Sequence, residues 1–305
     1  MKSVKLFGKS VSVLAIAIVG IISMGMVSAA LLEYYGKITT TVTVEQAVLL
    51  DGEDHTVTIS ETVSVVGGDV SYGADHYLRN NASVWILVSL DSAITNGNNE
   101  GLTVYPEYKL TPSYGGASNV GDEDDIHFYF EPRTWGSFNK VSFDYNIISG
   151  NARVPHVNMW LRSGDDEVQL TTWNGGNPPA DISNGRATYT RDIFTLLDGA
   201  PVTGYDGWIV REVRIQSGNP SLDPSPSEDV QVVYVSNVEV NQLGIINTIE
   251  LPTLDYANVP GRIVGFRLVY NAAFDIEPDT YTIDITVVPV GTIDESGVTI
   301  DGVVQ

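Results

Sequence analysis

The chain has 305 residues, of which 43% are hydrophobic and 18% are charged, a balance typical of a globular protein rather than a disordered one. Its 16 Lys and Arg against 38 Asp and Glu give a formal net charge of −22, which argues against a nucleic-acid partner because phosphate binding needs clustered basic residues. Cysteine is absent, so disulfides, thiolate metal sites and a cysteine nucleophile are excluded.

The first thirty residues have the pattern of a secretory signal peptide. Three lysines precede the apolar run 13–22, and Val27-Ser28-Ala29 supplies a cleavage site of small residues. An uncleaved anchor is the alternative, since the whole apolar stretch only just reaches the length needed to cross a bilayer. We expect residues 1–29 to be the signal peptide, with cleavage after Ala29 or Ala30. The mature chain would then be secreted to the cell surface, with no membrane span of its own.

Alternating apolar and polar residues dominate the mature chain, which is the pattern of half-buried β-strands. The first such segment places Ile38, Val42 and Val44 on one face. Similar segments recur along the chain between turns rich in Gly, Asn and Pro, and the one helical turn that the sequence predicts covers Asp192–Leu197. We therefore expect an all-β protein of the sandwich type, jelly-roll or immunoglobulin-like.

Composition changes twice along the chain and divides it into two expected domains. The polar stretch Ser113–Gly121 passes into an acidic run, and the strands that follow are richer in aromatic residues, with longer loops between them. After Asn241 the strands again resemble those of the first part of the mature chain. We expect one β-sandwich from residues 30–118 plus 246–290, a second jelly roll inserted as residues 119–245, and a C-terminal tail at 291–305. Insertion into a loop is easy when the ends of the inserted domain lie close together.

Several segments near the two chain ends share a resemblance to a known group. They are Leu31–Ile38, Thr41–Val48, Val84–Val88, Phe266–Tyr270 and Pro278–Ile283. They resemble archaeal secreted surface proteins related to the TasA and camelysin-like filament subunits. The resemblance implies a jelly-roll-like domain that assembles into extracellular fibres, in some members by donating an N-terminal strand to the next subunit. It covers only the terminal parts of the chain and includes no catalytic motif.

The middle of the chain resembles a jelly-roll carbohydrate-binding module. The segments concerned are Val141–Asn146, Val157–Leu161, Trp208–Ile215 and Val233–Val240. Such modules often end in a strand of the type Tyr-Val-Asp-Asn-Val, and Ser236 here replaces the acid, so a cation ligand is not expected at that position. The resemblance implies polysaccharide binding through exposed aromatic rings. The candidates, all at or near loops, are Trp135, Trp173, Tyr205 and Trp208, and burial in the core is the alternative for each.

Two further motifs predict surface chemistry. Asp122, Asp124 and Asp125 are the best candidates for a cation site, since Ca²⁺ takes several carboxylate and carbonyl oxygens and acids on one loop can supply them. A solvated linker is the alternative, because the twelve-residue loop with its closing Glu is missing. Asn81 begins the one glycosylation sequon, Asn-Ala-Ser, which predicts that this turn is at the surface.

The sequence contains none of the common catalytic motifs. The four histidines lack the His-Glu-x-x-His spacing of zinc peptidases, and no nucleophile elbow or dinucleotide fingerprint is present. We therefore expect a non-catalytic surface protein, an extracellular filament subunit that forms a homopolymer by exchanging the strand that contains Ile38, Val42 and Val44. One alternative is a polysaccharide-binding surface protein that does not polymerise. A glycoside hydrolase, whose carboxylates meet only in the fold, is the other.

Overall fold

The structure is a computed structural model, and it describes residues 3–6, 9–12, 48–52, 56–65, 70–82, 84–96, 101–110, 124–149, 154–172, 185–217, 232–241, 243–252, 264–294, 297–300 and 303–304. The chain divides into two compact units, residues 1–45 and 46–305. The first unit contains a hairpin of β1 (Ser3–Leu6) and β2 (Lys9–Ser12), which lies within the predicted signal peptide. The apolar run after it, and the predicted exchange residues Ile38, Val42 and Val44, lie outside the described residues.

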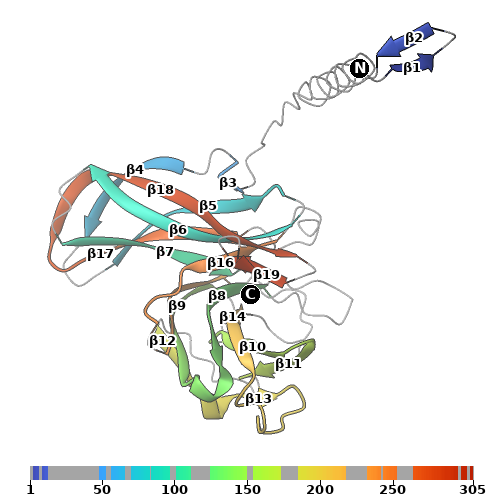
Figure 1. Ribbon diagram of the computed structural model, residues 1–305. Helices are drawn as coiled ribbons and strands as arrows, with labels where there is room; N and C mark the ends of the chain where they lie inside the picture. Colours follow the sequence, from blue (N-terminus) through green and yellow to red (C-terminus); the bar gives the residue numbers. More distant parts are fainter. Residues whose placement is uncertain are drawn as a thin grey trace, which may run out of the picture. The chain divides into compact units, whose positions relative to one another are not determined.

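Two antiparallel sheets pack as a sandwich in the second unit (Figure 1). The described part of the seven-stranded sheet has the order β12 (Gly185–Thr190), β9 (Lys140–Ser149), β15 (Val232–Val240), β7 (Leu102–Leu110), β17 (Val264–Ala272), β5 (Val70–Asn80), β3 (Val48–Leu50). The eleven-stranded sheet has the order β13 (Thr195–Leu196), β11 (Asp166–Thr171), β10 (His156–Ser163), β14 (Ile209–Ser217), β8 (Asp124–Thr134), β16 (Thr248–Leu251), β6 (Trp85–Asn96), β18 (Ile276–Asp294), β19 (Gly297–Ile300), β20 (Val303–Val304), with β4 (Thr56–Val65) also paired to β18.

The alternation in the sequence becomes the two faces of each strand. Every second residue points between the sheets, and these inward residues form one large hydrophobic cluster in which many side chains are fully buried. Examples are Phe128, Phe143, Val235, Phe266 and Ile283. The all-β sandwich is therefore confirmed. The expected helical turn at Asp192–Leu197 is instead the short 3-10 turn η2 (Arg191–Ile193) followed by β13.

The strands of the expected insertion lie together in space. They form one half of each sheet, and strands from the two chain ends form the other half; the labels β8 to β14 mark the first half in Figure 1, and β3 to β7, β17 and β18 mark the second. Each sheet continues across the boundary between the halves, which we call the seam. At the seam β8 pairs with β16 through Phe128 and Ile249, and β15 pairs with β7 through Val233–Val235 and Tyr108–Leu110. The two expected domains thus share both sheets.

The expected C-terminal tail also contributes to the sheet. Strand β18 continues through Asp294, and β19 pairs back onto its last four residues. The short strand β20 then pairs with β19. Residues 291–305 therefore include strands of the eleven-stranded sheet, next to the half built from the chain ends.

A tyrosine crosses the seam on each sheet. In the seven-stranded sheet, Tyr234 of β15 donates its hydroxyl hydrogen bond to Asp75 Oδ1 of β5 at 2.6 Å. In the other sheet, Tyr129 of β8 donates to Glu250 Oε2 of β16, also at 2.6 Å. Hydrogen bonds to a charged carboxylate are stronger than neutral ones. In each sheet, a charge-assisted hydrogen bond between described residues therefore joins the two halves, in addition to the shared core.

We expect Tyr129→Phe to lower the free energy of unfolding by about 1.5–3 kcal/mol, because a nearly buried hydrogen bond to a carboxylate is lost. Tyr234→Phe should cost about 1–2 kcal/mol, since Asp75 is partly exposed. Tyr189→Phe is the matched control, because its hydroxyl donates to the Pro155 carbonyl oxygen within one half. Urea denaturation measures all three changes.

Hydrogen exchange gives the sharper comparison. Amides of the seam strands, at residues 108–110 and 233–235, should exchange faster in Tyr234→Phe and keep their protection in Tyr189→Phe when both are corrected for global stability. Equal exchange in the two variants would contradict a specific role at the seam.

Candidate functional site

Among the residues that the structure describes, the edge of the seven-stranded sheet beside β5 is only partly covered. Strand β3 pairs with Leu78–Asn80 of β5 and then ends, because Asp51 and Gly52 have φ angles of 53° and 81° and turn the chain away. Asp51 closes this short ladder, since its backbone nitrogen donates to the Tyr77 carbonyl oxygen at 2.9 Å and its Oδ1 accepts from the Tyr77 nitrogen at 2.8 Å. No described strand pairs with Val70–Gly73 on this side.

Apolar side chains are exposed along the same strand. Val70 is 40% exposed, Tyr72 is 38% exposed and Tyr77 is 46% exposed. A sheet edge with exposed apolar side chains is a template for pairing with another strand, and proteins usually protect such an edge with charges, proline or a covering segment. The edge of β5 is therefore a candidate for strand addition.

A network of charges fixes the outer face of β5. The Arg267 guanidinium lies between two tyrosine rings, 3.8 Å from the Tyr72 centroid and 3.7 Å from the Tyr234 centroid. It donates two hydrogen bonds to Glu107 Oε2, at 2.9 and 2.8 Å. Lys109 is paired with Asp75. These contacts hold the tyrosine rings of the edge strand and its neighbours in place.

The charge on Asp75 is stabilised by its neighbours. Burial acts to raise the pKa of this carboxyl group, but hydrogen bonds from Lys109 and Tyr234, together with the positive charges of Lys109 and Arg267, outweigh burial and lower the pKa below its usual value. Asp75 is therefore an anion at neutral pH. Its negative charge balances the cations of the network.

The described structure places the predicted cation ligands differently from the expected loop. Asp122 lies outside the described residues, whereas Asp124 and Asp125 are the first residues of β8. The Asp125 carboxylate is ion-paired with Arg214 and lies 3.4 Å from His127 Nε2. In the part of the chain that the structure describes, no three His, Cys, Asp or Glu residues are grouped as metal ligands would be. Ca²⁺ binding stays a prediction.

The predicted sugar-binding aromatics divide into three cases. Trp135 is only 1% exposed, so the expectation of an exposed ring is wrong for this residue and burial in the core is correct, because its ring packs against Phe138 and Phe194. Tyr205 and Trp208 are half-buried and pack edge to face, with centroids 4.9 Å apart. Trp173 lies outside the described residues.

Asn81, the residue of the predicted glycosylation sequon, is in the turn between β5 and β6 and is half-buried.

One convergence of carboxylates was invisible in the sequence. Glu212 of β14 and Glu250 of β16 are 4% and 9% exposed, and the Tyr129 hydroxyl donates to Glu250 Oε2. Burial and these two negative charges raise the pKa of Tyr129. Arg162 Nη2 lies 3.7 Å from Glu212 Oε2. The arginine offsets part of the negative charge of the pair, and the arrangement joins three neighbouring strands, β14, β8 and β16, at the seam.

Comparisons with known proteins give no family for this chain. No family model and no curated protein matches it. Among solved structures, it is similar to those of infectious bursal disease virus, Gx strain, at 9% identity and a TM-score of 0.19, and Gt strain, at 8% identity and 0.17. Each alignment covers 81% of this chain and 82% of the viral chain. These TM-scores are too low to support an argument about fold or function.

A search of the described residues for membrane-spanning helices gives a negative result. None of the described elements is a helix of the length and apolar character that crossing a bilayer requires.

We expect Asp75→Asn to lower the free energy of unfolding at pH 7 by roughly 1 kcal/mol, after allowing for solvent screening of this partly exposed carboxylate. The folded-state pKa of Asp75 lies below its unfolded value of about 3.9. Its contribution is therefore present above that value and is lost as the pH falls through the folded-state pKa. The difference between Asp75→Asn and the wild type should shrink as the pH falls below about 4.

Urea denaturation between pH 2 and 7 measures this difference. Asp165→Asn, in the exposed turn between β10 and β11, is the control and should follow the wild-type curve. A constant difference between Asp75→Asn and the wild type at every pH would show that the carboxylate charge has no role in stability.

Proposed function

We propose that the chain is a secreted cell-surface protein that assembles into filaments by strand addition at the edge of β5. The observation that carries this proposal is the short β3, which covers three residues of β5 and leaves exposed apolar side chains on the rest of the strand. The occupant we propose is the N-terminal segment 31–46 of a second copy, with its alternating residues Ile38, Val42 and Val44. The resemblance to TasA and camelysin-like subunits supports the same mode of assembly.

The physical argument concerns which strand completes the sheet. Val48 pairs with Asn80 and Leu50 with Leu78, so the N-terminal end of β3 lies at the end of the ladder that is farther from Val70–Gly73. A strand from another subunit has no such constraint and adds main-chain hydrogen bonds to the edge. Such a contact joins different surfaces of the two copies, so it is head-to-tail and grows a fibre unless the rotation closes it into a ring.

The first test removes the donor. A mature protein lacking residues 31–46 keeps Val48–Leu50, the buried strand β3, and should fold but form no fibres by electron microscopy. A synthetic peptide of residues 31–46 should bind this truncated protein, and the same peptide with Val42→Asp and Val44→Asp should bind at least tenfold more weakly, because charge would enter an apolar face. Fibres formed by the truncated protein would disprove strand donation.

The second test alters the acceptor. Val70→Lys with Tyr77→Lys places two charges along the edge of β5, a common means of preventing edge pairing. We expect this variant to stay monomeric in sedimentation at concentrations that polymerise the wild type. Ile148→Lys, at a 53% exposed residue of β9 in the other half of the same sheet, is the matched control and should polymerise normally. If both variants polymerise, the edge of β5 is not the contact.

A further inference from the structure

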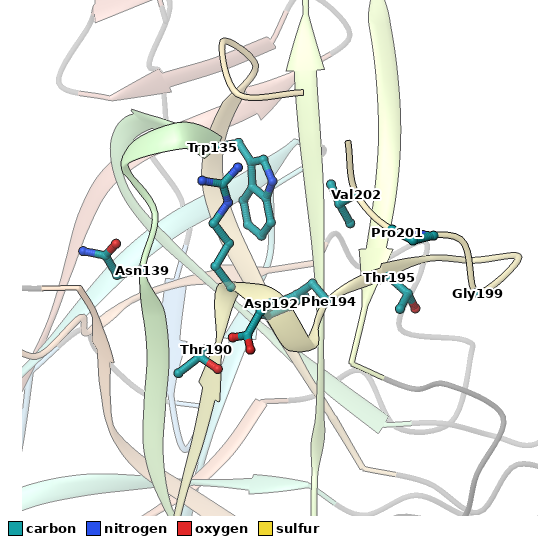
Figure 2. A pocket seen from close by; sticks show the side chains of 10 residues that line it. Trp135, Asn139, Thr190, Asp192, Phe194, Thr195, Gly199, Pro201 and Val202 are labelled. Carbon is teal, nitrogen blue, oxygen red and sulfur yellow. The ribbon is translucent and has the colours of Figure 1, made fainter. Parts of the chain in front are cut away.

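A hollow of about 520 Å³ lies beside the last residue of β12, the strand at the opposite end of the seven-stranded sheet from β3. Its wall includes residues of the 3-10 turns η1 (Trp135–Ser137) and η2, and of the hairpin that begins with β13. Figure 2 shows Asn139 on one side of the hollow and Pro201 and Val202 on the other. Small-molecule sites have volumes of roughly 300–1,000 Å³, so this hollow has room for a side chain that enters from outside.

The hairpin beside the hollow has an exposed leucine at its tip. Thr195 bridges to Pro201, and Leu196 N donates to the Ala200 carbonyl oxygen at 2.9 Å. Leu197 therefore lies in the turn that joins the two arms of the hairpin. It is 67% exposed, the largest fraction among the large hydrophobic residues that the structure describes. Most of its apolar surface is thus available for burial against a partner.

Ile193 adds a second exposed apolar side chain at the hollow. It is 43% exposed and lies between Asp192 and Phe194, both of which line the hollow. A single exposed apolar residue is common on protein surfaces and needs no explanation. Here a protruding side chain, Leu197, and a space that can receive one lie on the same surface. Such a surface can be complementary to a second copy of itself.

The charges at the rim are also complementary to each other. Asp192 is exposed, and a hydrogen bond from the Thr190 side chain lowers the pKa of its carboxyl group, so it is an anion at neutral pH. Lys140, the first residue of β9, is exposed and pairs with Thr190 in the ladder between β9 and β12. Neither Lys140 nor Asp192 is ion-paired with another described residue, whereas Arg191 is paired with Asp206. One cation and one anion therefore remain available for a partner.

We propose that this surface is a two-fold contact between two copies of the chain. Leu197 of each copy enters the hollow of the other, against Pro201 and Val202. Lys140 of each copy pairs with Asp192 of the other. An isologous contact requires a surface that is complementary to itself, and a surface with a protruding side chain, a hollow, a cation and an anion meets this requirement. The contact goes beyond filament formation at β5, because it joins subunits in pairs rather than head to tail.

The test uses the full mature protein with Val70→Lys and Tyr77→Lys, so that filament growth through β5 does not obscure a dimer. Sedimentation equilibrium should show monomers and dimers in this background. Leu197→Asp should weaken the dimer about tenfold, because a charge would enter the hollow. Ile148→Asp, at a 53% exposed residue of β9 outside the hollow, is the matched control and should dimerise like the background protein.

Two results would overturn the contact. One is a background protein that stays monomeric at about 1 mM, and the other is equal dimerisation of the Leu197→Asp and Ile148→Asp variants. Circular dichroism of each variant checks that it is folded. The dimer does not depend on the edge of β5, so dimerisation and filament formation can each fail alone, and electron microscopy of the protein without the β5 substitutions tests the filament separately.

Charge reversal tests the two-fold arrangement itself. In the same background, Lys140→Glu or Asp192→Lys places like charges opposite each other twice, so each variant alone should dimerise about tenfold more weakly at low salt. An equimolar mixture of the two variants should recover the affinity of the background protein, because both pairs are then attractive. Added salt should reduce these differences. A mixture that dimerises no better than the single variants would overturn the pairing of Lys140 with Asp192.

Discussion

The structure depends on one constraint, that both sheets must bury their inner faces in a single core. Each half of the molecule has strands in both sheets, and their inward side chains meet in one hydrophobic cluster that extends across the seam. Phe128 from one half and Tyr108 from the other pack edge to face with centroids 5.6 Å apart. Because these contacts join one half in one sheet to the other half in the other sheet, the halves cannot turn against each other without exposing apolar surface.

The outer faces reinforce this constraint with polar groups. On each sheet a tyrosine from the half built by the middle of the chain donates to a carboxylate of the other half. Around Tyr234, the stacked Arg267 and its partner Glu107 extend the network over neighbouring strands. Buried charges are costly unless they are paired, and here each carboxylate has a donor. The shared core supplies most of the cohesion, and the tyrosines fix the register of the two halves.

The shared sheets determine where the proposed contact lies. Strand β5, next to the short β3, is near one end of the seven-stranded sheet, and the strands of the other half continue that sheet to β12 at its far end. A contact between subunits at the edge of β5, as proposed, would leave the β12 end of the sheet uncovered by that contact.

The sequence by itself determined the fold class. Alternation with a period of two is a local property, so it predicted strands that recur along the mature chain without knowledge of their partners. It also separated the middle of the chain from its ends. It could not show that the two parts share both sheets, because pairing between β15 and β7 depends on contacts more than a hundred residues apart along the chain.

Only the tertiary structure decided which polar and aromatic groups are brought together. Trp135 was expected near a loop and does begin a short turn there, yet its ring is buried because Phe138 and Phe194 pack against it. Asp75 and Tyr234 are 159 residues apart in sequence and meet across the seam. The open edge of β5 likewise follows from where Asp51 turns the chain. The alternating pattern indicates on which face of its strand a residue lies. Its burial and its hydrogen-bond partners depend on which strands become neighbours in space.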